Sequence, residues 1–148
     1  MSFFGGLTYY NQIIMHKREG IYLEISSFYV IFAAEFTIHY NMQKEQEHTL
    51  AAIRECLAKN MPANGKAILF GSQARGTARE DSDWDILIIL DKEELLPSDY
   101  DSITYPLTML GWDLGKEINP VMYSAKEWQK YRNTAFCKNV EKEGIRLI

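Results

Sequence analysis

The order of apolar and polar positions along the chain predicts helices that alternate with short strands. Apolar residues recur at helical spacing between Met42 and about Asn60, and "MPANG" then breaks the predicted helix. Two short apolar runs follow, over residues 66–70 and 83–90. The second is apolar on both faces after an acidic start, which is typical of an interior strand that is covered on each side.

The next two segments each contain a proline that constrains the interpretation. Residues 100–115 predict a helix, in which Pro106 marks either a kink or the true first turn. Residues 116–123, "KEINPVMY", predict a third strand. Because a proline cannot donate to a sheet ladder, Pro120 places this strand near a sheet edge.

The last part of the chain predicts two helices. "SAKE" forms a capping box, in which Ser124 can cap the Glu127 amide, and its helix runs to about residue 133. A further helix over 136–143 ends at Gly144, and "IRLI" predicts a short strand or a tail. The whole pattern is that of the α/β (α+β) class, with a small mixed β-sheet flanked by helices.

Length and composition describe an ordinary globular chain. Its 148 residues suit one domain with a single core. The net charge of -4 argues against a general nucleic-acid binder, so no direct binding of nucleic acid is expected. Cys56 and Cys137 lie far apart, without a CxxC motif or a histidine at ligand spacing. They are expected to be reduced thiols in or near the core of a cytoplasmic protein.

Residues 1–41 read differently from the rest. Their start lacks the basic and apolar blocks of a signal peptide. Glu24 and Glu35 interrupt the apolar segment that follows, so no membrane span is expected. Met42 opens like a new protein, with a polar lead-in and then an amphipathic helix. We therefore expect 1–41 to be an extension outside the native protein, and 42–148 to be the functional domain.

Two carboxylates stand at the start of the strand over 83–90. Because strand side chains alternate, Asp83 and Asp85 point the same way, while Trp84 points to the other face and is expected to pack there. Charge at the start of so apolar a strand is costly without a positive partner. Two carboxylates at this spacing can hold divalent cations in common, and Mg²⁺ prefers carboxylates, waters and phosphate oxygens.

A Gly-Ser pair lies ten residues before this acidic pair. Gly71 follows the strand over 66–70 and allows a sharp turn, while Ser72 is expected at or near the N-cap of a helical turn. The first amides of such a turn are free to hold a phosphate. Arg75, one turn on, could reach the same phosphates.

Together these residues form "GSQARGTAREDSDWDILIIL", which resembles the signature of the polymerase-β-type nucleotidyltransferase superfamily. It is most similar to the minimal nucleotidyltransferase (MNT-type) proteins, with their "GSxARGxA…SDxD" form. The elements of that form are present as Gly71, Ser72, Ala74, Arg75, Gly76, Ala78, Ser82, Asp83 and Asp85. The resemblance covers Met42 to Ile148 and implies the polymerase-β-like nucleotidyltransferase fold.

The resemblance also implies a reaction. A nucleoside monophosphate, most often AMP from ATP, would pass to a hydroxyl acceptor with the help of two Mg²⁺ ions. Asp83 and Asp85 would be catalytic metal ligands. Gly71 and Ser72 would hold the triphosphate, and Arg75 would be a further nucleotide-binding residue.

Members of this superfamily usually add a third carboxylate from a later strand. Glu117 and Asn119 compete for that position and share one strand face. We favour Glu117 as the third catalytic residue because it carries the acid. If Asn119 is the equivalent, the chain would be a slow transferase or a nucleotide-binding relic.

The acceptor is less well defined. The chain ends about sixty residues after the acidic pair, so the acceptor surface is expected on another protein. The resemblance points to a small helical HEPN-type toxin, which MNT-type antitoxins adenylylate. A small-molecule transferase of the aminoglycoside-modifying kind and a non-catalytic binding module are the alternatives. We expect Tyr123, Trp128 and Tyr131 to belong to the core rather than to a nucleobase platform.

Overall fold

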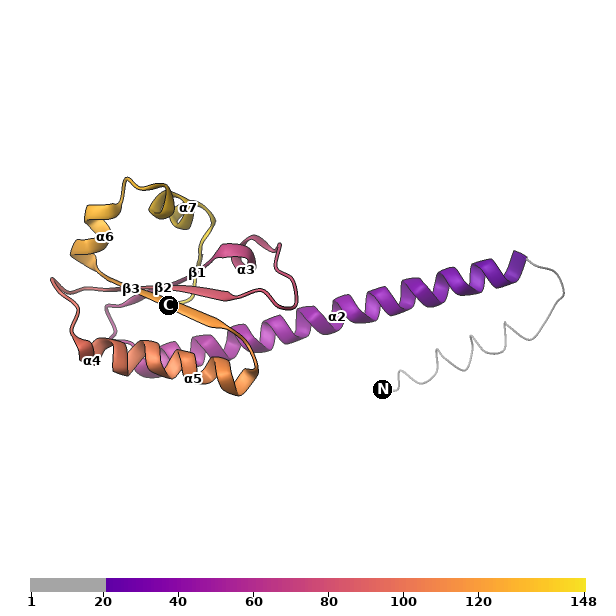
Figure 1. Cartoon of the computed structure of the whole chain (residues 1–148), viewed down its shortest axis with the longest axis horizontal. Helices are drawn as coiled ribbons and strands as arrows, with labels where there is room; N and C mark the ends of the chain where they lie inside the picture. The colour runs from indigo at the N-terminus through magenta and orange to yellow at the C-terminus, as the bar shows by residue number, and fades with distance from the viewer. Residues whose placement is uncertain (1–20) are drawn as a thin grey trace. The chain divides into compact units, whose positions relative to one another are not determined.

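The computed structural model describes residues 21–148, with side chains from Phe28 onward (Figure 1). Within it, helix α2 spans Ile21–Asn60. The chain divides within α2 into two compact units, at Lys44 and Glu45. No helix among the described residues is long and apolar enough to cross a membrane.

The start of α2 differs from the sequence-based expectation of a helix from Met42. The helix begins 21 residues earlier, at Ile21. The reason is local, because no glycine or proline occurs between Ile21 and Asn60 and nothing there ends the helix. The interpretation of residues 1–41 as a non-native extension stays a prediction.

The second unit is built on a four-stranded mixed sheet, in the order β3-β2-β1-β4. β2 pairs with β3 in parallel, and β1 pairs with β2 and β4 in antiparallel fashion. The strands are β1 (Lys66–Phe70), β2 (Trp84–Leu90), β3 (Ile118–Ser124) and β4 (Ile145–Arg146). This arrangement confirms the predicted α+β class, and it confirms that Pro120 lies in an edge strand.

Helices cover both faces of the sheet (Figure 1). The C-terminal part of α2 and helices α4 and α5 lie on one face, and α3, α6 and α7 on the other. The helices are α3 (Gly71–Arg75), α4 (Pro97–Asp99), the π-helical turn η1 (Tyr100–Thr104), α5 (Tyr105–Leu114), α6 (Ala125–Tyr131) and α7 (Ala135–Glu143). Pro106 is the second residue of α5, which directly follows the π-helical turn η1, so it lies inside a continuous helical run over 97–114 and not at the true first turn.

The main core lies between the sheet and the layer of α2 and α5. From β2 it receives Trp84, Ile86, Ile88 and Leu90, which alternate along the strand. Ile53 and Leu57 of α2 and Ile103 and Leu107 of η1 and α5 pack against them. Trp84 is 3% exposed, which confirms that it is a packing residue.

Two predictions about helix starts had different outcomes. The capping box is confirmed, since Ser124 Oγ accepts from the Glu127 amide at 3.1 Å and Glu127 Oε2 accepts from the Ser124 amide at 2.9 Å. Ser72, which was expected at or near the N-cap of α3, is the second residue of that helix and does not itself cap it. Phe70 occupies the cap without a side-chain bond, because the chain turns into the helix directly at Gly71.

Candidate functional site

The turn at Gly71 lies directly against the carboxylate of Asp85. β1 and β2 pair so that Phe70, the last residue of β1, stands opposite Asp85. Gly71 then adopts a φ of 76°, which favours glycine, and a Cβ atom there would collide with Asp85 Oδ2. The antiparallel pairing therefore brings together the Gly-Ser turn and one of the two acids, as the sequence predicted.

Asn119 joins the same cluster from the neighbouring strand. It stands opposite Asp85 in the parallel register of β2 and β3. Its Nδ2 atom donates a hydrogen bond to Asp83 Oδ2 at 3.2 Å. The two acids and the amide therefore share one face of the sheet, at the end where β2 and β3 begin.

In the cluster, the effects that disfavour a charged Asp85 are larger than those that favour it. Burial raises the pKa of Asp85 above its ordinary value, and the negative charge of Asp83 raises it further. The positive charge of Arg75 and the amide of Asn119 lower the pKa of Asp85, but these are smaller effects. A cation between the two carboxylates would remove the repulsion that raises this pKa.

The donor set fits Mg²⁺. Both acids supply carboxylate oxygens, the ligands that this ion prefers, and Asn119 donates to Asp83 through nitrogen. Among the described residues, no group of three or more histidine, cysteine, aspartate or glutamate side chains is arranged to hold a metal ion. A Mg²⁺ ion here would therefore depend on Asp83 and Asp85, with waters and phosphate oxygens as its other ligands.

Glu117 lies at the border of this cluster. It stands immediately before β3 and is exposed, and its carbonyl oxygen accepts a hydrogen bond from the Trp84 amide at 2.8 Å. The structure thus uses its backbone to join β3 to β2. The side chain that contacts the acids is the amide of Asn119. A catalytic role for Glu117 stays a prediction.

Arg75 has a partner that the sequence did not reveal. Its Nη1 atom lies 3.5 Å from Oε2 of Glu143 in α7, and both side chains are well exposed. An exposed pair at this distance is weak, so it leaves the guanidinium free to exchange partners. The positive charge of Arg75 lowers the pKa of Asp85, so the arginine lies close enough to interact electrostatically with that acid.

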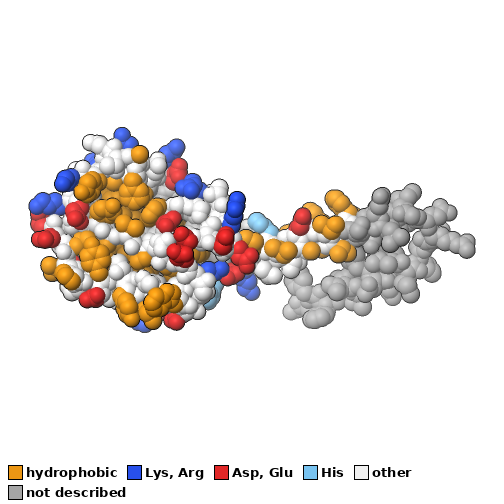
Figure 2. Space-filling view, in the orientation of Figure 1, with side chains coloured by type: hydrophobic (Ala, Val, Ile, Leu, Met, Phe, Trp, Pro, Cys, Tyr) orange, Lys and Arg blue, Asp and Glu red, His pale blue; other side chains and the backbone are white. Residues whose placement is uncertain are grey.

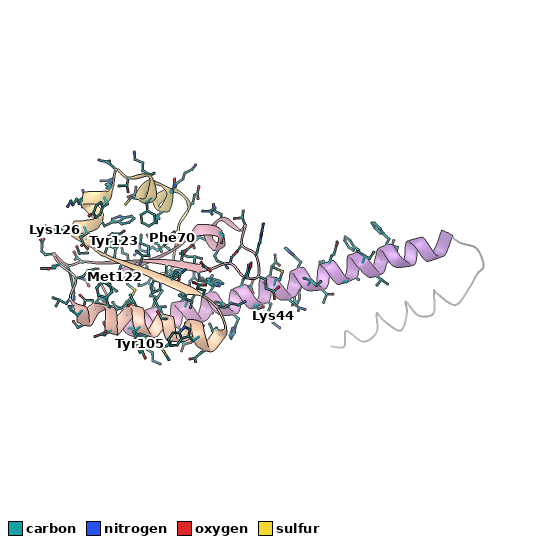
Figure 3. All side chains as sticks on the ribbon, viewed as in Figure 1. Lys44, Phe70, Tyr105, Met122, Tyr123 and Lys126 are labelled. Carbon is teal, nitrogen blue, oxygen red and sulfur yellow. The ribbon has the colours of Figure 1, made fainter. Side chains whose placement is uncertain are left out.

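A group of aromatic rings extends from the site along the same face of the sheet. The ring of Phe70 meets that of Phe136 at 5.5 Å, and Phe136 meets Trp128 at 6.1 Å. Tyr123 meets Trp128 at 5.7 Å and Tyr131 at 6.2 Å. Figure 3 shows Phe70 and Tyr123 on the opposite side of the sheet from Tyr105. Tyr123, Trp128 and Tyr131, which were expected in the core, therefore lie outside the main core.

The chain is similar to several known proteins. A family model described as the nucleotidyltransferase domain matches residues 50–147. A protein of Methanocaldococcus jannaschii that is named as a candidate protein adenylyltransferase is 40% identical over 79 residues. That match covers 53% of this chain and 73% of the relative.

Two solved structures are also similar. One is a toxin–antitoxin structure with AMP-PNP, at a TM-score of 0.48 and 23% identity, over 67% of this chain and 72% of that one. The other is a mutant of the toxin–antitoxin MntA–HpeT, at a TM-score of 0.47 and 19% identity, over 67% of this chain and 71% of that one.

Proposed function

The chain belongs to the nucleotidyltransferase domain family, and on this basis we propose that it transfers AMP from ATP to a hydroxyl group of a partner protein. The observation that carries the proposal is the cluster of Asp83, Asp85 and Gly71 at one end of the sheet. The register of β1 and β2 and the close contact of Gly71 place the turn against Asp85, and a hydrogen bond from β3 holds Asp83. The name of the archaeal relative supports a protein as the acceptor.

The proposed reaction breaks a phosphoanhydride bond of ATP and forms a phosphate ester bond to the acceptor. The hydroxyl oxygen of the acceptor forms a bond to the α-phosphorus of ATP. The bond from that phosphorus to the bridging oxygen breaks, and pyrophosphate leaves with its electron pair. The acceptor's proton must pass to a base, and we propose the carboxylate of Glu117, because the amide of Asn119 cannot accept it.

The residues of the cluster would divide the remaining work. Asp83 and Asp85 would hold Mg²⁺, which stabilises charge on the phosphates when it is bound. The backbone at Gly71 and Ser72 would bind the triphosphate. Because Gly71 has no Cβ atom, this turn can lie directly against the carboxylate of Asp85, which would hold Mg²⁺. Arg75 would exchange Glu143 for a phosphate oxygen.

The partner that we propose is a small helical protein of the HEPN type, with this chain acting as its antitoxin. A surface hydroxyl on such a partner would meet the acids at the exposed end of β2. One observation favours a second candidate function. Because Asn119 rather than an acid contacts Asp83, the chain could bind nucleotide and transfer it slowly or not at all.

The test is a transfer assay with α-labelled ATP, Mg²⁺ and the product of the neighbouring gene. We expect label on the partner protein, and we expect the Asp83→Ala/Asp85→Ala variant to lose it by on the order of 10³-fold. Label on an added aminoglycoside instead would identify a small-molecule transferase. Nucleotide binding without any transfer would identify the binding module.

Two single variants separate the candidates for the third position. Glu117→Gln should lower the transfer rate strongly if Glu117 is the base. Asn119→Ala removes the hydrogen bond to Asp83 and should lower the transfer rate less. Full transfer by Glu117→Gln would contradict our assignment of that residue. Thermal unfolding of each variant serves as the control for folding.

A further inference from the structure

We propose that a largely aromatic surface beside the acids binds the base of the nucleotide. It is made of Val121, Tyr123, Trp128 and Phe136. This inference rests on the proposed function, since it takes the triphosphate to lie at Gly71 and Asp85. It adds the part of the site that would hold the nucleoside.

The surface continues the face of β3 that carries Asn119. Side chains two residues apart on a strand share a face and stand about 7 Å apart. Val121 and Tyr123 therefore follow Asn119 in a line that leads away from the acids. A nucleoside whose phosphates sit at the acids would extend along this line.

Phe136 brings the surface close to the Gly-Ser turn. Its ring meets that of Phe70 edge-on at 5.5 Å, and Phe70 is both the register partner of Asp85 and the neighbour of Gly71. Trp128 lies on the other side of Phe136, at 6.1 Å. The rings thus form one wall of the surface, which begins within a residue of the phosphate turn.

Two of the four side chains, Val121 and Phe136, are exposed, and Tyr123 and Trp128 are half-buried. On β3, Val121 is 37% exposed, whereas Ile118 and Met122 on the opposite face are 5% and 7% exposed. Phe136 is 38% exposed although it contacts two other rings. Figure 2 shows hydrophobic side chains gathered between α6, α7 and the sheet, with acidic side chains beside them.

The chemistry of the surface suits stacking. Every base has an aromatic face, and stacking on aromatic side chains is a general way to bind it. Val121 and Phe136 carry no polar group, and the polar groups of the surface are the hydroxyl of Tyr123 and the indole N–H of Trp128. Because the surface is otherwise apolar, we expect stacking area to contribute most to selection. We therefore expect ATP to bind more tightly than CTP, and CTP more tightly than inorganic tripolyphosphate.

The experiment compares these three ligands, each with Mg²⁺, by calorimetry on the full chain. Phe136→Ala should weaken binding of ATP about 10-fold and leave binding of tripolyphosphate unchanged, because only the stacking contact is lost. Phe136→Trp should restore the affinity for ATP. Bound ATP should also quench the tryptophan fluorescence of a Trp112→Phe background, in which Trp128 and the buried Trp84 are the remaining tryptophans.

The control is Tyr105→Ala, which removes a more exposed ring, at 60% against 38% for Phe136, from α5 on the other face of the sheet. It should change none of the three affinities. Equal ATP affinity in Phe136→Ala and the parent would overturn the proposal, and so would an equal loss of ATP and tripolyphosphate. A variant that binds ATP normally but no longer modifies the partner would assign the surface to the acceptor instead.

These outcomes differ from a failure of the proposed function. If the parent protein binds neither ATP nor tripolyphosphate, the nucleotidyl-transfer proposal fails, and the base surface fails with it. If the parent transfers AMP and Phe136→Ala keeps its full affinity for ATP, only the base surface is wrong.

Discussion

The two faces of the sheet are built from the same strands and yet have different surroundings. On the face toward α2 and α5, Ile86, Ile88 and Leu90 of β2 are fully buried. On the face toward α3, α6 and α7, the same strand opens with Asp85, and β3 adds Asn119 and the half-exposed Val121. The first face carries the main core. On the second face Leu87 of β2 and Cys137 and Val140 of α7 are buried as well, but the side chains at the site and on β3 stay accessible.

The alternation of strand side chains makes this division possible. Successive residues of β2 point to opposite faces, so one rigid strand can anchor itself in the core and still present an acid. Asp85 lies within β2 itself, and Asp83 directly precedes the strand. We call the face toward α2 and α5 the dry face and the face toward α3, α6 and α7 the open face. The packing of β2 on the dry face therefore fixes the position of the acid on the open face.

The largest expected effect on stability is at the dry face. Ile88→Ala removes a fully buried side chain and should lower the free energy of unfolding by about 2–5 kcal/mol. Val121→Ala, the matched change on the open face, should cost less than about 1 kcal/mol. Chemical denaturation measures both. Equal costs would show that the two faces contribute alike to stability.

An intermediate effect is expected at the turn. Gly71→Ala and Gly76→Ala both place a side chain at positive φ, which costs roughly 1–2 kcal/mol. At Gly76 no atom lies within 4 Å of the added Cβ, whereas at Gly71 the Cβ collides with Asp85. Gly71→Ala should therefore also lower transfer at least about 10-fold, while Gly76→Ala should not. Similar transfer rates in the two variants would contradict the role of the close contact.

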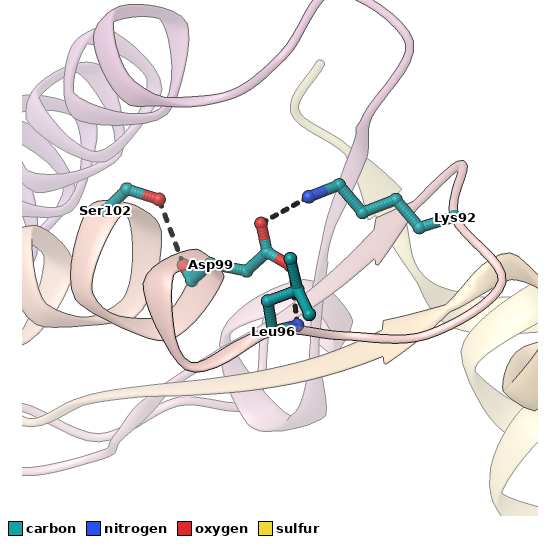
Figure 4. A network of polar contacts seen from close by, with 4 residues as sticks. All are labelled: Lys92, Leu96, Asp99 and Ser102. Atoms are coloured by element: carbon teal, nitrogen blue, oxygen red, sulfur yellow. Dashed lines mark hydrogen bonds and ion pairs between the residues drawn. The ribbon is translucent and has the colours of Figure 1, made fainter.

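A smaller effect is expected at a buried acid of the dry layer. Asp99 accepts hydrogen bonds from Lys92 Nζ at 2.6 Å and from the Leu96 amide at 2.9 Å (Figure 4). These bonds lower the pKa of Asp99, in contrast to the raised pKa of Asp85. Because Lys92 is partly exposed, Asp99→Asn should cost only about 1 kcal/mol at pH 7.

The pH dependence of that cost follows from the direction of the shift. Because the pKa of folded Asp99 is lowered, its contribution is complete above the pKa of the unfolded chain, about 3.9. The contribution is lost as the pH falls through the folded pKa. Unfolding curves of the parent and Asp99→Asn should therefore converge in acid. A gap that stays constant down to the lowest pH would exclude this explanation.

Local sequence signals predicted much of the fold. The run "KAILF" and the capping box at Ser124 and Glu127 act over a few residues, and both are confirmed. The start of α2 was missed because the predicted boundary relied on the change of character at Met42. The helix itself needs only a segment without glycine or proline, and it continues through that point.

The site was harder to predict where it depends on distant residues. Gly71 and Asp85 could be placed together because a strand and its turn lie close in sequence. The bond from Asn119 to Asp83 joins residues 36 apart, and the pair of Arg75 and Glu143 joins residues 68 apart. Both depend on strand register and helix docking, which local patterns do not determine.

The position of β3 at the edge of the sheet limits how another protein can approach the acids. One side of β3 is paired with β2, and Pro120 removes an amide donor from the strand. An extended segment that tried to lengthen the sheet beside Asn119 would therefore lack a hydrogen bond that continuous pairing requires. A partner is left to approach across the open face, with a side chain rather than a strand as the part that enters.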